Sequence, residues 1–308
     1  MKVLIVASYN TNRYSPFVTE QVNSLIQGGG IEADYFGIQG KGFIGYILCR
    51  KRLVKKIKEY KPNLIHAHYG LSGLLANLQR RIPVITTFHG SDIHSRGYLL
   101  MLSKLCMKLS RYNIFVNNEL YRISKYKRKN YAIQPCGVDL KIFHSIEKKE
   151  ARKILGWSEH IKYVLFAGAF DNTIKNYPLA QKSVFLQKYC KLIELKGYNR
   201  EEVNLLINAC DCLLMTSHRE ASPMVIKEAM ICGCPIVSVD VGDVKEIVTG
   251  VEGCYIVKRN ENDIADKLNQ VFSFNERHNG CEKIIQLGLE NIIVAKKVEN
   301  IYNKILRT

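Results

Sequence analysis

The chain has 308 residues, which is too long for one small module and suits two domains of ordinary size. Hydrophobic residues make up 47% and charged residues 24% of the sequence, so a disordered or fibrous chain is excluded. The longest apolar runs have the length of a strand, far below the roughly 18 residues that a transmembrane helix needs. We therefore expect a globular protein that stays in the cytoplasm.

The net charge of +17 is concentrated in one half of the sequence. Residues 1–150 contain 24 Lys and Arg against 9 Asp and Glu, a balance of +15, whereas residues 151–308 contain 21 against 19, a balance of +2. Two basic runs, Arg50–Lys61 and Tyr121–Lys129, hold much of the excess. Each run alone resembles an ordinary solvated helix face. The asymmetry favours an anionic partner for the first half, either a phospholipid surface or nucleic acid.

The ten cysteines occur mostly in apolar contexts, where Cys behaves as a small hydrophobic residue, so we expect no disulfides. Two C-x-C pairs, Cys210/Cys212 and Cys232/Cys234, lack the C-x2-C spacing that is usual in zinc sites. We therefore expect no structural metal.

Apolar or β-branched runs alternate with helical patterns along the whole chain, which predicts βαβ units and parallel sheets. The expected strands of the first half are Val3–Ala7, Tyr35–Ile38, Leu64–His68, Pro83–Gly90 and Asn113–Asn118. The expected helices between them are Phe17–Gln27, Gly45–Tyr60 and Gly97–Ser110. The second half predicts strands at Tyr163–Gly168, Lys191–Gly197, Cys212–Ser217, Pro235–Val241 and Gly253–Val257, and a last long helix over Glu282–Leu306.

The alternation pauses at His144–Gly156, which indicates a junction between two Rossmann-like sheets. We expect domains over residues 1–150 and 151–285, and a C-terminal helix over residues 286–308 that packs back toward the N-terminal domain. Doubly wound sheets bind ligands at the carboxyl ends of their strands, so we expect the site in a cleft between the domains.

The most informative motif, His218–Met230, follows the expected strand Cys212–Ser217. Ser222 suits the N-cap of a helix and Pro223 its first position. The free N–H groups of such a helix would face a phosphate or diphosphate. Glu220 and Glu228 carry carboxylates, seven residues apart, that suit sugar hydroxyls. An ordinary capped helix with solvent-facing glutamates is the alternative interpretation.

This segment resembles the E-x7-E motif of retaining GT-B glycosyltransferases of family 4. The resemblance implies that Glu220 contacts the donor sugar and Glu228 the ribose of the nucleotide. It also implies that Ser222, Pro223, Met224 and Val225 meet the diphosphate through their backbone, although Pro223 has no N–H to donate. The segment Gln134–Phe143 is similar to the family's entry into the second domain, with Cys136 where the family has Asn.

Other matches place the acceptor side on the first domain. The strand ends around His68 and around His89, Gly90 and Asp92 resemble those that line the acceptor site. The resemblance puts His89 beside the reacting carbon. We expect His66 and His68 to point one inward and one outward from their strand, with His68 near the cleft.

The chain departs from the family pattern after Gly168. Lys175 matches the family's diphosphate-binding Lys, but Ala169 stands near the place of an Arg. One βα unit is also missing before Lys191–Gly197, so the second domain should be shorter by about that unit. Lys175 and the helix end would then stabilise the leaving diphosphate without Mg²⁺ or another cofactor.

The favoured interpretation is an α/β, GT-B glycosyltransferase with an acceptor-side first domain and a nucleotide-sugar donor domain. It would transfer a sugar from a nucleotide-diphosphate sugar to an acceptor hydroxyl with retention, in cell-surface polysaccharide or lipid-linked glycan biosynthesis, with His89, Glu220 and Lys175 as catalytic residues. An anionic membrane surface would explain the charge and place the enzyme peripherally on the inner face of the cell membrane. A sugar-nucleotide 2-epimerase on the same fold and a basic nucleic-acid-binding protein remain the alternatives.

Overall fold

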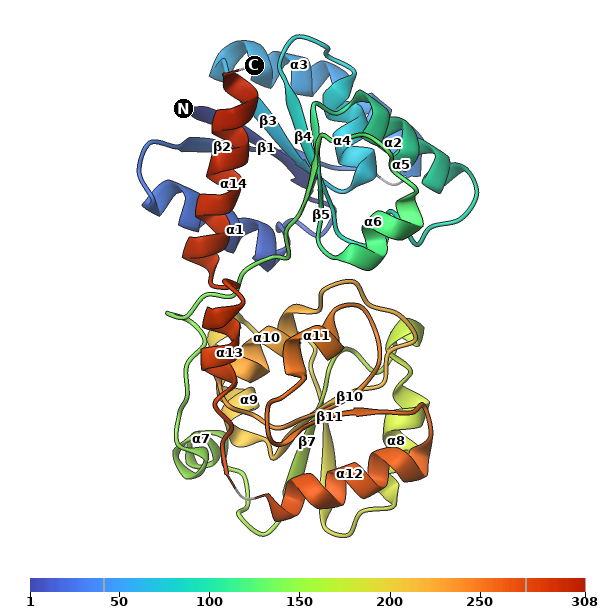
Figure 1. Cartoon of the computed structure of the whole chain (residues 1–308), viewed down its shortest axis with the longest axis vertical. Coiled ribbons are helices and arrows are strands. Elements are labelled where there is room, and N and C mark those ends of the chain that lie inside the picture. The colour runs from blue at the N-terminus through green and yellow to red at the C-terminus, as the bar shows by residue number, and fades with distance from the viewer. Residues whose placement is uncertain (41, 275, 308) are drawn as a thin grey trace. The chain divides into compact units, whose positions relative to one another are not determined.

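The computed structural model describes residues 1–40, 42–274 and 276–307, which form two compact units (Figure 1). The first unit contains Met1–Gly137 and Asn291–Thr308, and the second contains Val138–Glu290. We expected the boundary between the domains near residue 150, but the two units divide after Gly137. The physical reason is burial, because Val138 and Phe143 are fully buried in the hydrophobic core of the second unit.

The first unit is built on a six-stranded parallel sheet with the order β2-β1-β3-β4-β5-β6. Its central strands are buried on both faces, as is usual for parallel sheets, although β3 and β4 carry buried His and Thr side chains. Strand β6 was not predicted, since its three residues are too few for a periodic pattern. The strands are β1 (Lys2–Ser8), β2 (Glu32–Ile38), β3 (Leu64–His68), β4 (Val84–Phe88), β5 (Tyr112–Phe115) and β6 (Tyr131–Ile133).

Helices cover the sheet of the first unit, and the C-terminal helix α14 packs beside α1 (Figure 1). The expected helix over Gly45–Tyr60 is two helices, because the chain breaks at Cys49. The helices are α1 (Pro16–Gln27), α2 (Gly42–Leu48), α3 (Arg50–Tyr60), α4 (Gly70–Asn77), α5 (Tyr98–Leu109), α6 (Asn118–Ser124) and α14 (Asn291–Leu306).

The second unit has a five-stranded parallel sheet with the order β11-β10-β9-β7-β8. Two parallel sheets with helices between their strands confirm the predicted α/β class. The strands are β7 (Lys162–Phe166), β8 (Cys190–Glu194), β9 (Cys212–Met215), β10 (Ile236–Val239) and β11 (Cys254–Val257). The helices are α7 (Lys148–Leu155), α8 (Tyr177–Phe185), α9 (Arg200–Ala209), α10 (Met224–Ile231), α11 (Val244–Val248), α12 (Glu261–Ser273) and α13 (Gly280–Gln286), with a 3₁₀ turn at Thr173–Lys175.

The prediction of one helix over Glu282–Leu306 is wrong. Helix α13 ends at Gln286, and α14 begins at Asn291. Between them Gly288 adopts a φ of +62°, a conformation that ends helices and that glycine adopts without strain. Helix α13 belongs to the second unit and α14 to the first, so the break between them lies at the return of the chain to the first unit.

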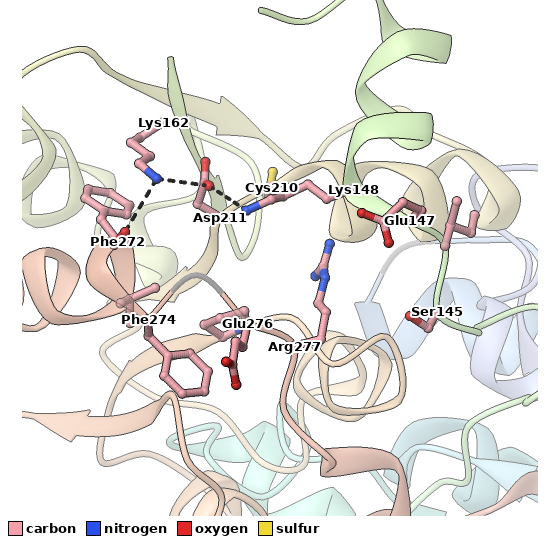
Figure 2. A pocket seen from close by; sticks show the side chains of 13 residues that line it. Ser145, Glu147, Lys148, Lys162, Cys210, Asp211, Phe272, Phe274, Glu276 and Arg277 are labelled. Atoms are coloured by element: carbon pink, nitrogen blue, oxygen red, sulfur yellow. Dashed lines mark hydrogen bonds and ion pairs between the residues drawn. The ribbon is translucent and has the colours of Figure 1, made fainter. Parts of the chain in front are cut away.

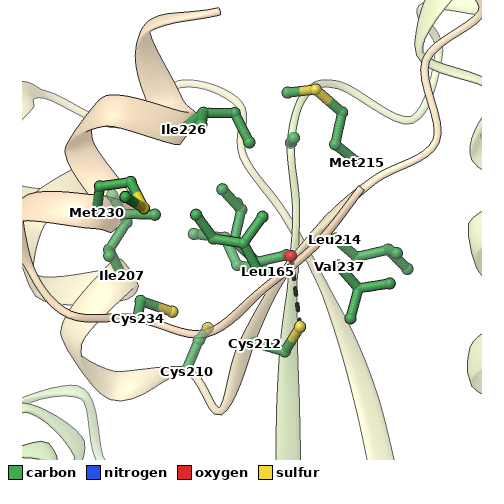
Figure 3. Close-up of a cluster of buried hydrophobic side chains, with 14 of the residues drawn as sticks. Leu165, Ile207, Cys210, Cys212, Leu214, Met215, Ile226, Met230, Cys234 and Val237 are labelled. Atoms are coloured by element: carbon green, nitrogen blue, oxygen red, sulfur yellow. Dashed lines mark hydrogen bonds between the residues drawn. The ribbon is translucent and has the colours of Figure 1, made fainter. Parts of the chain in front are cut away.

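All ten cysteines are free thiols. Cys210, Cys212 and Cys234 lie among Leu165, Leu214 and other apolar side chains of the second core (Figure 3). Burial raises the pKa of the Cys212 thiol well above its ordinary value, which keeps it protonated. Within residues 1–40, 42–274 and 276–307, no group of three or more His, Cys, Asp or Glu side chains is arranged to hold a metal ion.

Candidate active site

Lys175 and Glu220 meet at the carboxyl edge of the second sheet. Lys175 ends the 3₁₀ turn that follows β7, and Glu220 lies in the loop that follows β9. Lys175 Nζ donates to Glu220 Oε1 over 2.7 Å. Both side chains are largely buried, with exposures of 22% and 15%. The sequence predicted each residue singly, and the structure brings them into one ion pair.

Two backbone features hold Lys175 in place. Gly168 has a φ of +158°, and a Cβ atom there would come within 2.7 Å of the Lys175 side chain. Only glycine therefore lets that side chain lie across the end of β7. The 3₁₀ turn is also tied to the loop after β9, because Thr216 donates to the carbonyl of Lys175 and the N–H of His218 donates to that of Ile174.

Helix α10 begins beside this ion pair, one residue later than predicted. Pro223 occupies the N-cap position, and no side chain caps the helix. The prediction that Ser222 is the N-cap is wrong, because its hydroxyl accepts a hydrogen bond from Lys227 Nζ at 2.8 Å instead. The N–H groups of Met224 and Val225 belong to the first turn of α10, which in any helix has no intrahelical acceptor. An anion is favoured at such a helix end.

Glu228 is almost completely buried and is paired with Arg200. Arg200 Nη2 donates to Glu228 Oε1 over 2.7 Å, and the Glu228 side chain is 2% exposed. The Arg200 guanidinium also lies 4.6 Å from the ring centre of Phe143. Burial raises the pKa of Glu228, and the nearby Arg200 and Lys227 oppose that rise. One oxygen of Glu228 thus has a fixed cationic partner.

Sequence reasoning did not identify Arg200, Lys227 or Asp243 as site residues. Arg200 is the first residue of α9, after the N-cap Asn199, and nothing in the local sequence distinguishes it from an ordinary helix residue. Lys227 is fully buried. Asp243 is 5% exposed, and its Oδ1 atom has no hydrogen-bond partner within the described ranges of the chain. Burial raises the pKa of Asp243, and Lys227 opposes the rise. The signal that could have revealed Lys227 was its place on a helix whose other residues, apart from Glu228, are apolar.

The first unit brings together the strand-end residues that were predicted for the acceptor. His68 ends β3, and His89 follows β4. His68 Nδ1 and His89 Nε2 share a hydrogen bond of 3.0 Å. His66 stacks on His68 with ring centres 4.5 Å apart. The prediction that His66 and His68 point to opposite sides is wrong, because residues two apart on a strand share a face.

Backbone amides hold Asp92 in the same region. The N–H of Gly90 donates to its Oδ1 over 2.9 Å, and the N–H of Gly70 donates to its Oδ2 over 3.1 Å. Burial nevertheless raises the pKa of Asp92 to about 6. Burial also lowers the pKa of His68 to about 3 and that of His89 well below its usual range, so both imidazoles are neutral at pH 7.

We expect His68 to make the stability of the protein depend on pH. Its pKa falls from 6.5 in the unfolded chain to about 3 in the folded one. Between these values only the unfolded chain binds the proton, so the free energy of unfolding falls as the pH drops below 6.5, by about 1.4 kcal/mol per unit for one such group. The raised pKa of Asp92 acts in the opposite direction below pH 6.

Chemical denaturation of the wild type and of His68→Gln at several pH values between 7.5 and 5 would measure this effect. The substituted protein should lose less stability on acidification than the wild type, because its side chain does not titrate. Equal losses in the two proteins would show that His68 binds its proton equally in both states.

Comparison with known proteins identifies the family of the chain. Residues 5–142 match the family described as Glycosyltransferase Family 4, and residues 188–287 match the family described as Glycosyl transferases group 1. The chain belongs to the group 1/family 4 glycosyltransferases. The family resemblance of the sequence is therefore confirmed over most of its length.

Two curated relatives of this glycosyltransferase are distant. Over 220 residues it is 23% identical to the putative teichuronic acid biosynthesis glycosyltransferase TuaC of Bacillus subtilis. Over 241 residues it is 23% identical to an N,N'-diacetylbacillosaminyl-diphospho-undecaprenol alpha-1,3-N-acetylgalactosaminyltransferase of Campylobacter jejuni. The matches cover 62% and 67% of this chain, but 57% and 64% of the relatives, which is less than two thirds of their own length.

Solved structures of similar proteins show the GT-B fold. Sucrose-phosphate synthase from Thermosynechococcus elongatus matches with a TM-score of 0.86 and 16% identity, covering 100% of this chain and 99% of that one. HepE from Anabaena in complex with UDP-glucose matches with a TM-score of 0.77 and 14% identity, covering 99% of this chain and 100% of that one. The predicted GT-B fold is thus confirmed.

Proposed function

We propose that this protein transfers a sugar from a nucleotide-diphosphate sugar to an acceptor hydroxyl with retention of configuration. The proposal rests on two ion pairs, Lys175–Glu220 and Arg200–Glu228. Glu220 lies just before α10, and Glu228 lies within it. A cation and a helix N-terminus suit a diphosphate, and two fixed carboxylates suit the hydroxyls of two sugars. UDP-glucose bound to HepE supports a nucleotide sugar as the donor class.

Each residue has a distinct role in this proposal. Lys175 and the N–H groups of Met224 and Val225 bind the diphosphate and stabilise its charge as it leaves. Glu220 accepts hydrogen bonds from the donor sugar, and the second oxygen of Glu228 accepts from the ribose. Gly168 supports the donor side by giving Lys175 room.

On the first unit, His68, His89, Gly90 and Asp92 form the acceptor side of the proposal. His89 is neutral and is held by His68, so it can donate or accept a hydrogen bond beside the reacting carbon. The name of the Campylobacter relative includes a diphospho-undecaprenol acceptor. Together with the TuaC match, it supports a lipid-linked glycan or a cell-surface polysaccharide as the product class.

A screen of UDP-, GDP- and ADP-sugars tests the proposal. We expect one class of donor to raise the Tm and to give, with a lipid-linked or saccharide acceptor, a product heavier by one sugar residue. Conversion of the donor to its 2-epimer without an acceptor would favour the epimerase interpretation instead. Absence of both donor binding and donor turnover would contradict the proposal.

We expect turnover to persist in EDTA. The positive charge that the leaving diphosphate needs is available from Lys175 and from the α10 N-terminus. The measurement is the initial rate after dialysis against EDTA, with and without added Mg²⁺ or Mn²⁺. A rate that is lost in EDTA and restored by either ion would show that a metal takes part.

We further propose that the first unit docks on the inner face of the cell membrane. None of the helices described in the structure is long and apolar enough to span a bilayer. Helices α2 and α5 both pack on α4, and large apolar side chains are exposed on each, including Ile44 and Leu48 at 74% and Met101 at 64%. The basic helix α3 follows α2 directly. Apolar side chains beside Lys and Arg suit an anionic lipid surface.

Vesicle co-sedimentation measures this docking. We expect binding to anionic vesicles that weakens with salt, since each Lys or Arg near the surface contributes about 1 kcal/mol. Replacement of Lys51, Arg52, Lys55 and Lys58 with Gln should reduce vesicle binding and spare turnover on a soluble acceptor. Equal binding to neutral and anionic lipid would contradict the proposal, and preferential capture by nucleic acid would favour the nucleic-acid alternative.

A further inference from the structure

A cavity of about 230 Å³ lies in the second unit (Figure 2). It is at the end of the sheet opposite to the proposed donor residues. Lys162 begins β7, Asp211 directly precedes β9 and Pro235 directly precedes β10, so the cavity opens at the amino ends of these strands. Its other walls come from the start of α7 and from the segment after α12. Nothing in the proposed transfer reaction uses this cavity.

One buried carboxylate in this cavity is surrounded by three cations. Asp211, with its side chain 4% exposed, lies 2.6 Å from Arg152 Nη2, 3.2 Å from Lys148 Nζ and 3.7 Å from Lys162 Nζ. Arg152 and the N–H of Tyr163 together satisfy Oδ2. The cluster therefore carries two more positive than negative charges in a partly buried place.

A fourth cation, Arg277, lines the same cavity. Its Nη2 atom donates to the carbonyl of Asn208, and among the residues that the structure describes its buried Nη1 atom has no hydrogen-bond partner. Figure 2 shows its guanidinium directed toward the side of the cavity that carries Lys148. The carboxylates of Glu147 and Glu276 are on exposed residues, and in the described part of the chain no ion pair joins them to these cations. The three cations around Asp211 exceed its single negative charge, and such an excess of partly buried positive charge favours an anion.

We propose that this cavity is a second binding site that takes a phosphate group, either as inorganic phosphate or as a small phosphomonoester. A phosphate group carries −1.5 to −2 charges near neutral pH, which suits the excess of two positive charges around Asp211, and its oxygens can accept hydrogen bonds from Lys148 and Lys162. The cavity is smaller than the roughly 300–1,000 Å³ of sites for larger ligands but holds more than one water. The uncapped first turn of α7, at Lys148, adds a favourable dipole.

Isothermal titration with inorganic phosphate, and separately with glycerol 3-phosphate, tests the proposal at constant ionic strength. Lys148→Gln and Lys162→Gln should each weaken binding about tenfold, the loss expected for one charged hydrogen bond. Both proteins should fold, since Asp211 keeps Arg152, and circular dichroism checks this. Lys149→Gln, at the next residue of α7, is the matched control outside the cavity and should bind as the wild type does.

Phosphate could also bind at the start of α10, so Lys175→Gln is the second control. It should retain the phosphate binding that Lys148→Gln loses. Binding of both ligands, or of one alone, identifies the source of the phosphate group and supports the site. Binding of neither ligand, equal binding by Lys148→Gln and the wild type, or a loss confined to Lys175→Gln would overturn the proposal. None of these results depends on transferase activity.

Discussion

Glu228→Gln should weaken the binding of the nucleotide-sugar donor roughly ten- to a hundredfold. The substitution keeps the shape of the side chain but removes the charge that would strengthen the proposed hydrogen bonds to the ribose, a loss of about 1.5–3 kcal/mol. The carboxylate is buried and is held by Arg200, so it is already placed before the donor binds. Calorimetric titration with the donor found in the screen, or with its free nucleotide diphosphate, gives the change in Kd.

Two further variants make this result specific. Glu246→Gln changes an exposed glutamate on α11 and should leave donor affinity unchanged. Arg200→Ala removes the larger of the two cationic contributions that oppose the rise in the pKa of Glu228. Donor affinity in that variant should therefore fall as the pH drops through the newly raised pKa, more steeply than in the wild type. A folded Glu228→Gln protein with wild-type affinity would remove Glu228 from the donor site.

Lys175→Ala should lower kcat/KM about 100- to 1,000-fold, the usual cost of removing one group that stabilises charge as it develops. Lys175 is the cation at the expected diphosphate position, because Ala169 stands near the place where the resemblance leads us to expect an Arg. Its loss also leaves Glu220, which is 15% exposed, without its ion-pair partner. Steady-state kinetics with a varied donor separate the effect on kcat from that on KM.

Lys182→Ala provides the matched control, since Lys182 is exposed on α8, the helix that follows Lys175. It should have wild-type kinetics. A Lys175→Ala protein that folds and turns over at the wild-type rate would show that the positive charge for the leaving diphosphate comes from elsewhere. Arg200 and Lys227 would then be the first residues to substitute, because both lie close to Glu228.

The sequence by itself determined the class of fold and the segments of the site. Strand-length apolar runs that alternate with helical periodicity favour a parallel sheet, because such a sheet buries both faces of each run. The resemblance to the E-x7-E motif then pointed to Glu220 and Glu228 around one helix start, and the resemblance after Gly168 pointed to Lys175, which follows β7. These are local features, and local sequence is enough to predict them.

Tertiary structure alone decided which side chains became partners. Arg200 and Glu228 are 28 residues apart, and His68 and His89 are 21 apart, so no helical or strand period joins either pair. The same holds for Asp211, whose cations Lys148 and Arg152 come from α7. Such contacts depend on how whole elements pack, and a pattern within one element carries no information about them.

The boundary between the two domains and the start of α10 also depend on both local sequence and long-range contacts. The alternation of strand and helix patterns is interrupted near residue 150. The second hydrophobic core nevertheless begins at Val138, because Val138 and Phe143 are buried in it. The hydroxyl of Ser222 has the chemistry of an N-cap, yet it pairs with Lys227, whose buried ammonium needs an acceptor. Local preference sets where an element can form, and the larger free energy of burial and of pairing buried charges decides where it ends.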